Sequence, residues 1–166
     1  MYHAIARNRE RIPLAIAACT KNKMDNLKIS IRPALLSDLT EMQKLFVETI
    51  EAICEKDYSP EQIKAWTSSV KQTNSWVNRL QKQYFLIAQS NNKIIGYSSL
   101  EGIDYLDFLY VHKNFQRQGI ADRLYAKIEH EAIKRGSTIL NADVSITAQP
   151  FFFSIRKNSL KALLSS

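Results

Sequence analysis

The clearest chemical signal in this chain is the short run at residues 116–121 (QRQGIA). The run follows a segment dense in aromatic and branched residues, 105–111, which predicts a buried strand. A loop that enters a helix through Gly119 leaves several backbone N–H groups without partners, and the helix dipole adds positive partial charge there. The run therefore predicts an anion site suited to a pyrophosphate.

The helix behind this loop is marked by an apolar residue at every fourth position. These residues are Ile120, Leu124, Ile128 and Ala132. Gly136 stands where a helix C-cap belongs. Strand, loop and helix together predict a βα unit that presents the loop to a ligand.

The rest of the chain has a mixed α/β pattern. Further strands are expected at 27–32, 84–89, 93–100 and 138–144, and helices at 39–53, from Pro60 onward, and at 75–81. Ser90-Asn91-Asn92 predicts a hairpin between two of the strands. Ser59-Pro60-Glu61-Gln62 predicts a helix start, with serine at the N-cap and glutamine three residues later.

Gln116-x-x-Gly119-x-Ala121, directly after Leu109-Tyr110-Val111, resembles the acetyl-CoA signature of the GNAT superfamily, the general-control-type N-acetyltransferases. The likeness extends more loosely over 27–153, and the predicted order of strands and helices is similar to that of the family. The resemblance implies an α/β fold class, namely a GNAT-like acyl-CoA N-acyltransferase fold with a central, mostly antiparallel sheet flanked by helices. An ordinary βα unit with an incidental glycine is the alternative.

The resemblance first implies a site for acetyl-CoA as the acetyl donor. Backbone groups of the 109–111 strand would bond the pantetheine arm, and the N–H of Val111 would face the thioester carbonyl. Backbone N–H groups of the loop would hold the pyrophosphate, and Arg117 would add a charge-assisted bond unless it is a hydrated surface charge. The full set expected to bind acetyl-CoA is Leu109, Tyr110, Val111, Gln116, Arg117, Gln118, Gly119, Ile120, Ala121 and Ser145.

The candidate catalytic residue is a carboxylate that acts as general base for the amine. Asp107 is the first choice, because an unpaired carboxylate at mid-strand is costly to maintain, and Glu101 at a strand end is the second. Glu101 and Asp104 also fit hydrated turn residues, which is the more common role. His112 follows the strand at a loop entrance, where a hydrated histidine is expected rather than a base.

The chain departs from the family after the 138–144 strand. Phe152 stands where the family often has the tyrosine that protonates the leaving thiolate, and Ser145 stands where it often has asparagine. Past Phe153 no Gly-Phe pair follows, and the basic tail 154–166 shows no pair of strands. We therefore expect the usual final β-hairpin to be missing and a sheet edge to be exposed. Stability would then be marginal unless a partner, such as a second copy in a homodimer, covers the gap.

Residues 1–23 do not resemble the rest of the chain. Three arginines precede a short apolar stretch that Pro13 interrupts, and its end, Ile16-Ala17-Ala18-Cys19, is similar to a lipoprotein cleavage box. Export is one interpretation. The favoured one is a leader outside the fold, with Met24 as the natural start. The expected organisation is thus a leader at 1–23, a GNAT N-acetyltransferase domain at 24–153 and an atypical basic tail at 154–166.

The net charge of +7 lies outside the predicted core, which limits the classes of partner. Residues 1–32 contribute +5 and 151–166 contribute +3, whereas 33–150 contribute −1. Neither basic tail interleaves aromatic residues with its charges, so no nucleic-acid partner is expected. No apolar run approaches the roughly 20 residues that span a membrane, so no membrane partner is expected either. The two cysteines lack metal-ligand spacing, which favours free thiols, no metal and a reducing, cytoplasmic location.

Together these features predict an enzyme that moves an acetyl group from acetyl-CoA to a primary amine of a small molecule or peptide by direct attack. Cys54, Asp57, Tyr58 and Trp66 lie where the family's variable helical segment helps to build the acceptor pocket, although core packing also explains Trp66. The leading alternative is a catalytically weakened acyl-CoA-binding module, and a nucleic-acid-binding domain that uses the basic tails is a further one.

Overall fold

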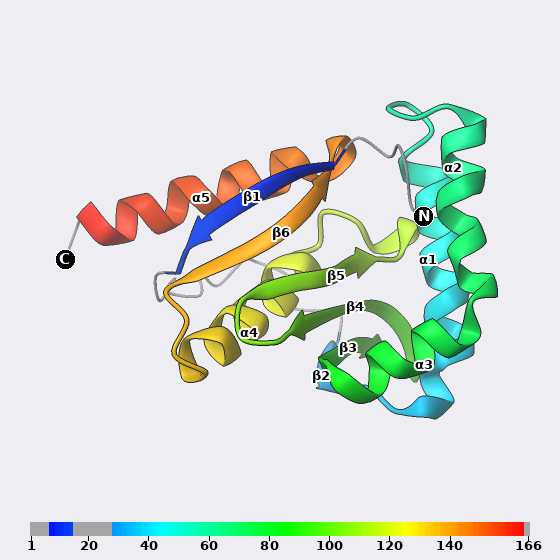
Figure 1. The fold of residues 1–166 in the computed structure, drawn as a ribbon, viewed down its shortest axis with the longest axis horizontal. Coiled ribbons are helices and arrows are strands. Elements are labelled where there is room, and N and C mark those ends of the chain that lie inside the picture. Colours follow the sequence, from blue (N-terminus) through cyan, green and yellow to red (C-terminus); the bar gives the residue numbers. More distant parts are fainter. Residues whose placement is uncertain (1–6, 15–27, 165–166) are drawn as a thin grey trace.

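A six-stranded sheet forms the centre of the computed structural model, which describes residues 7–14 and 28–164 (Figure 1). The strands lie in the order β1-β6-β5-β4-β3-β2, and all neighbours are antiparallel except β5 and β6. The strands are β1 (Arg7–Pro13), β2 (Ser30–Pro33), β3 (Tyr84–Ser90), β4 (Lys93–Glu101), β5 (Tyr105–Val111) and β6 (Ile139–Ser145). The helices are α1 (Leu39–Ile53), α2 (Pro60–Thr67), α3 (Thr73–Lys82), α4 (Ile120–Lys134) and α5 (Gln149–Leu164). The predicted α/β class with a mostly antiparallel sheet is confirmed.

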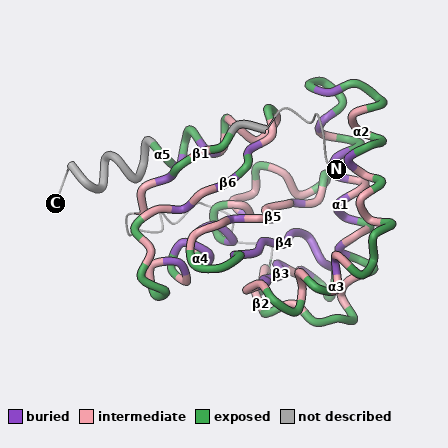
Figure 2. Tube along the Cα trace, in the orientation of Figure 1, coloured by how far each residue is buried: buried purple, intermediate pink, exposed green. Residues whose placement is uncertain are grey.

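Helices cover both faces of the sheet, and each face has its own hydrophobic core. On one face α1, α2 and α3 pack around an aromatic cluster that includes Phe46, Trp76 and Phe108. On the other face α4 and α5 pack around Leu124 and Ile128. β4 is buried at every position except its two ends and separates the two cores (Figure 2). Within the described ranges, no helix combines the length and apolar character that crossing a bilayer requires.

Three of the predicted local signals are confirmed. Ser59 accepts a hydrogen bond from the N–H of Gln62, whose side chain accepts one from the N–H of Ser59, so the two form a capping box before α2. The hairpin between β3 and β4 turns through Asn91 and Asn92, both at positive φ. Gly136 follows α4 with φ of 87°. These signals are local, which is why the sequence alone revealed them.

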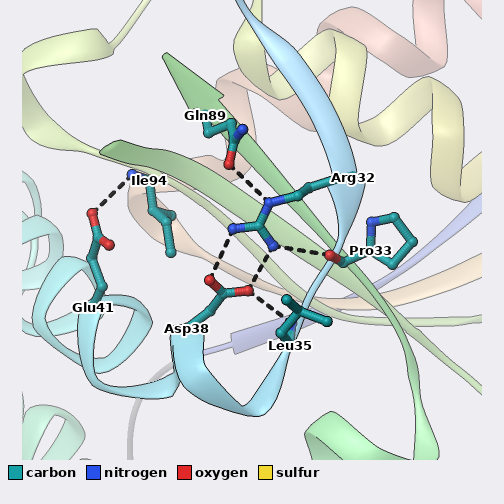
Figure 3. A network of polar contacts seen from close by, with 7 residues as sticks. All are labelled: Arg32, Pro33, Leu35, Asp38, Glu41, Gln89 and Ile94. Carbon is teal, nitrogen blue, oxygen red and sulfur yellow. Dashed lines mark hydrogen bonds and ion pairs between the residues drawn. The ribbon is translucent and has the colours of Figure 1, made fainter. Parts of the chain in front are cut away.

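A polar network fixes the approach of α1 to the sheet (Figure 3). Arg32 donates to both carboxylate oxygens of Asp38, at 2.7 and 2.9 Å. Hydrogen bonding from Arg32 holds the pKa of the Asp38 carboxyl below its usual value. The same carboxylate accepts the N–H of Leu35 rather than capping α1. Glu41, in the first turn of α1, accepts the N–H of Ile94 at 2.9 Å and ties the helix to β4.

The N-terminal segment contributes a strand, which corrects the expectation that residues 1–23 lie outside the fold. β1 pairs antiparallel with the free edge of β6, from Arg7↔Ser145 to Pro13↔Ile139. Ile12 is 1% exposed and belongs to the core beneath α4 and α5. The physical reason is that an edge strand offers a full row of backbone N–H and C=O groups, which a polar segment can pair as well as an apolar one.

The C-terminal segment is helical. Residues 154–164 of the basic tail belong to α5, and Ile155 is buried in the core. In the part of the chain that the structure describes, no strand follows β6. The edge that we expected to be exposed there is covered by β1, so the gap needs no second copy of the chain to cover it. A homodimer stays a prediction.

Replacing Ile12 with alanine should lower the free energy of unfolding by about 2 kcal/mol or more, because the cavity left in the core cannot collapse fully. Equilibrium unfolding in urea measures this change. Arg11→Ala is the matched control, since Arg11 precedes Ile12 on β1 and is exposed. Equal stabilities of the two variants would mean that β1 is not part of the stable fold.

Gly96 on β4 is required by close packing rather than by its backbone angles. A Cβ at this position would come within 2.9 Å of the carbonyl oxygen of Tyr110 and 3.2 Å of Ile120 on α4. We expect Gly96→Ala to cost about 1–3 kcal/mol, because backbone or helix must move. Ser98→Ala is the control, since the Ser98 hydroxyl is fully buried with no hydrogen-bond partner among the described residues. A thermal melt in which Gly96→Ala is as stable as Ser98→Ala would contradict this reasoning.

Candidate active site

The parallel strands β5 and β6 separate after two paired positions. Tyr105 pairs with Asn141 and Leu106 with Ala142, and the strands then diverge toward their C-terminal ends (Figure 1). A cavity of about 810 Å³ lies there, lined by both strands, α1, and the starts of α4 and α5. A volume of this size is typical of sites for small molecules and cofactors.

The backbone of β5 directs N–H groups into this opening. The N–H of His112 donates to the carbonyl of Ile95 on β4, and alternate residues of an antiparallel strand face the same neighbour. Tyr110 therefore faces β4, whereas Leu109 and Val111 face the side from which β6 has diverged. The backbone N–H groups of Leu109 and Val111, two residues apart, are thus left for a ligand that binds along the edge of β5.

The loop between β5 and α4 is held by side chains that converge on one carbonyl. Gln116 Nε2 donates to the carbonyl oxygen of Val111 at 2.5 Å, and the hydroxyl of Thr49 on α1 donates to the same oxygen at 3.4 Å. Arg117 and Gly119 have φ of 57° and 69°. Positive φ is uncommon for a residue such as arginine, and left-handed residues within a turn direct backbone N–H groups into a shared concavity.

The start of α4 completes this concavity. Gly119 is the N-cap residue, and no side chain caps the helix there. A Cβ on Gly119 would meet nothing within 4 Å, so the glycine is required by its φ and not by crowding within the protein. The first N–H groups of the helix therefore have the arrangement that the sequence predicts for an anion site.

The structure brings most of the predicted site residues together. Those that line the cavity are Asp107, Leu109, Tyr110, Val111, Gln116, Arg117, Ala121 and Ser145. Gln118 and Gly119 belong to the adjoining loop, and the side chain of Ile120 is buried in the core, so only its backbone can serve a ligand. The hydroxyl of Ser145 accepts the N–H of Ala148 and caps the turn after β6.

Glu101 is not brought to the site. It is exposed at the end of β4 and pairs with Tyr105, which is also where β5 pairs with β6. That end of the sheet is closed, whereas the cavity lies at the other end of β5. His112 is likewise engaged elsewhere, since its Nδ1 accepts the N–H of Asn114 and its Nε2 lies 3.5 Å from Glu48.

Asp107 is the extra residue of a β-bulge. Ser99 pairs with Phe108 and Leu100 with Leu106, so Asp107 has no partner on β4. A bulge re-aims its side chain, and here it brings the carboxylate to the cavity and to the end of α3. Asp107 Oδ2 accepts a hydrogen bond from Nε2 of Gln83, which directly follows α3, at 2.7 Å. The regular alternation of side chains along a strand therefore does not apply at this position.

The second wall of the cavity is built where the α1–α2 connection meets the turn after β6. The hydroxyl of Thr147 donates to Asp57 Oδ2 at 2.6 Å, and the N–H of Ile146 donates to the hydroxyl of Tyr58 at 2.9 Å. Burial raises the pKa of the Cys54 thiol, which also lines the cavity. Two segments about 90 residues apart in sequence thus close one end of the opening.

Several functional candidates were missed in the sequence. Thr49, Asp143 and Thr147 line the cavity, and none of them belongs to a motif that could have indicated it. Tyr58 and Trp66 are both buried in the core and stack edge to face at 5.6 Å, as core packing predicts, although Trp66 also reaches the cavity. Among the described residues, no group of three or more His, Cys, Asp or Glu side chains could hold a metal ion.

Comparison with known proteins identifies the class of this fold and site. The family model described as "Acetyltransferase (GNAT) domain" matches residues 54–155, more than half of the chain. The chain therefore belongs to the GNAT acetyltransferases, as the loop and strand order predicted.

Individual relatives agree with this assignment. The chain is 30% identical over 125 residues to the "Uncharacterized N-acetyltransferase YafP" of Escherichia coli K12, covering 75% of this chain and 77% of that protein. A GCN5-related N-acetyltransferase structure from Rhodopseudomonas palustris is 34% identical, with a TM-score of 0.76 and coverage of 80% and 83%. The PaiA N-acetyltransferase of Thermoplasma acidophilum, solved with coenzyme A, shares the fold at 24% identity, with a TM-score of 0.58 and coverage of 66% and 75%.

Proposed function

We propose that this protein transfers an acetyl group from acetyl-CoA to a primary amine of a small molecule or peptide by direct attack. The observation that carries the proposal is the opening between β5 and β6, which leads from the N–H groups of Leu109 and Val111 to the turn at Gly119. Acetyl-CoA has a matching layout, with an amide-bearing arm and a diphosphate. Two structures of the same fold, PaiA and an acetyltransferase from Brucella melitensis, contain coenzyme A and acetyl-CoA respectively.

The residues present fit each part of the donor. The loop from Arg117 to Ala121 would hold the diphosphate with backbone N–H groups, and the Arg117 guanidinium would add a charge-assisted bond. The edge of β5 would hold the pantetheine arm through backbone groups of Leu109. The N–H of Val111 would face the thioester oxygen and stabilise the negative charge that develops there.

Asp107, the first choice from the sequence, is the proposed general base, and Glu101 is no longer proposed because it lies away from the cavity. Its carboxylate would accept a proton from the acceptor amine as the new C–N bond forms and the C–S bond breaks. The electron pair of the broken bond leaves with the sulfur as a thiolate, which then takes up a proton. The acceptor would enter past Asp57 and Thr147, which line the cavity on its other wall.

Phe152 bears on the fate of that thiolate. It lines the cavity from the first turn of α5, is 6% exposed, and cannot donate a proton. Water would then supply the proton, which predicts a slow last step. This observation also favours a second candidate function, an acyl-CoA-binding module with weakened catalysis.

Introducing a hydroxyl by Phe152→Tyr should raise kcat, by up to about 100-fold, the lower limit of what general acid catalysis contributes. Steady-state release of free thiol from acetyl-CoA measures the effect. Phe151→Tyr is the control, because it adds the same hydroxyl to a neighbouring side chain of the cavity and should leave kcat unchanged. A kcat that is the same in the wild type and Phe152→Tyr would show that thiolate protonation does not limit turnover.

Calorimetric titration with acetyl-CoA, followed by thiol release in the presence of a panel of primary amines, tests the proposal as a whole. If the protein is the proposed enzyme, we expect it to bind acetyl-CoA and to release free thiol when an amine is added. Binding without release of thiol would favour the acyl-CoA-binding module, and absence of binding would refute both functions.

The prediction of a cytoplasmic location rests on the free thiol of the buried Cys54.

A further inference from the structure

The carboxylate of Asp107 is held asymmetrically by the end of α3. Its Oδ2 atom accepts a hydrogen bond from Gln83 Nε2 at 2.7 Å and lies 3.3 Å from Arg79 Nη1. Among the described residues, its Oδ1 atom accepts no hydrogen bond. One oxygen of the candidate base is therefore occupied, and the other is left for a ligand of the cavity.

The orientation of the Gln83 amide is fixed from both sides. An ionised carboxylate can only accept hydrogen bonds, so the NH₂ group of Gln83 must face Asp107. The amide oxygen then faces Ser99, whose fully buried hydroxyl donates to it at 2.6 Å. A flipped amide could still bond the Ser99 hydroxyl, but it would lose the bond to Asp107 and place its oxygen against the carboxylate oxygen. Only one orientation of the Gln83 amide therefore satisfies the hydrogen bonds that link Ser99, Gln83 and Asp107.

Arg79 is also held in place. Its guanidinium lies over the ring of Phe108, 5.2 Å from the ring centroid. Phe108 is the residue that follows Asp107 on β5. The attraction between a cation and an aromatic face favours this position of the guanidinium beside Asp107. Its side chain stays 41% exposed, so its charge is partly screened, and Gln83 provides the shorter contact to Asp107.

We propose that Gln83, with the support of Arg79 and Ser99, is a positioning residue that holds Asp107 Oδ2 and leaves Oδ1 as the atom that accepts the amine proton. This inference rests on the proposed function, in which Asp107 is the base. The bulge explains why such support is needed. A bulged residue lacks the ladder partner that fixes a regular strand position, so contacts from outside the strand must orient its side chain.

A purely structural role is the alternative, because the same contacts tie the end of α3 to β4 and β5. The two roles differ in what Gln83→Met should do. Methionine keeps the length of the side chain and removes both hydrogen bonds. A positioning role predicts that kcat falls while KM for acetyl-CoA stays unchanged. A structural role predicts that any fall in kcat is accompanied by a lower melting temperature.

The experiment measures kcat, KM for acetyl-CoA and melting temperature, with the fastest amine of the panel as acceptor. We expect Gln83→Met to lower kcat by about 10- to 100-fold, the range caused by a misplaced catalytic group, at unchanged KM. Gln81→Met is the matched control, since Gln81 is exposed on α3 two residues earlier, and its kcat should equal that of the wild type. Arg79→Lys, which keeps the charge, should retain more activity than Arg79→Met.

The double variant Gln83→Met/Asp107→Asn separates the two roles. If Gln83 acts through Asp107, the double variant is no slower than Asp107→Asn alone. Losses that multiply, or a Gln83→Met variant as fast as the wild type, would overturn the positioning role while leaving the base in place. An Asp107→Asn variant as fast as the wild type, or no turnover with any amine, would overturn both the base assignment and its support.

Discussion

Asp107→Asn lowers kcat by about 10²- to 10⁴-fold and leaves the dissociation constant for acetyl-CoA unchanged, if Asp107 is the general base. The amide cannot accept the proton of an ammonium, but it occupies nearly the same volume. Because the donor is expected to contact the backbone of Leu109 and Val111, its binding does not need the Asp107 charge. Thiol release at saturating acetyl-CoA, together with calorimetric titration, measures both quantities.

Glu101→Gln provides the control for this prediction. Glu101 is a carboxylate on the adjacent strand, but it is exposed at the end of the sheet where β5 and β6 are still paired. Its variant should turn over at the wild-type rate. A loss of activity in Glu101→Gln with full activity in Asp107→Asn would reverse the assignment of the two carboxylates.

Gly119→Val weakens acetyl-CoA binding by at least about tenfold. Valine is strained at a φ of 69°, where the left-handed conformation costs roughly 1–2 kcal/mol, and relief of that strain turns the loop N–H groups away from the anion. The new side chain also enters the open space in front of α4, where a diphosphate would lie. Titration with acetyl-CoA gives the dissociation constant of each variant.

Gly102→Val separates backbone strain from loss of the site. Gly102 has φ of 60° and open space around it, as Gly119 does, but it lies in the turn between β4 and β5, outside the cavity. Its variant should lose stability without losing acetyl-CoA affinity. Equal affinities for the two valine variants would show that the loop at Gly119 does not hold the donor.

The parts of this protein that could be predicted from its sequence are those written in local patterns. Helix periodicity, the capping box at Ser59 and the hairpin at Asn91 each involve residues a few positions apart, and each is confirmed. The loop at Gly119 could be predicted because its chemistry needs only a strand, a glycine and a helix in sequence. The order of these predicted elements is similar to that of the GNAT family, and the resemblance then implied how they assemble into one mostly antiparallel sheet.

The parts that could not be predicted depend on contacts between distant segments. β1 pairs with β6 across more than 125 residues, and its polar sequence carries no apolar alternation that would mark it as a strand. The bulge at Asp107 arises from a register shift between two strands, which neither strand shows alone. The side chain of Gln83 reaches Asp107 only because the end of α3 lies beside β5.

The covering of β6 by β1 has a consequence for the C-terminal region. Because the edge of β6 is paired, α5 can lie across β1 and β6 and bury Phe152 and Ile155 against the core. The pairing therefore stabilises the wall that Phe152 contributes to the cavity. Loss of β1 would therefore disturb the packing of Phe152 at the cavity as well as the packing of the core.

Amide hydrogen exchange with and without acetyl-CoA tests whether the donor lies along the diverging edge of β5, with its diphosphate at the start of α4. Added acetyl-CoA should slow exchange at the N–H groups of Leu109 and Val111 and at residues 119–121, and should leave β2 and β3 unchanged. Binding of acetyl-CoA that protects other segments and leaves these amides unprotected would contradict the account.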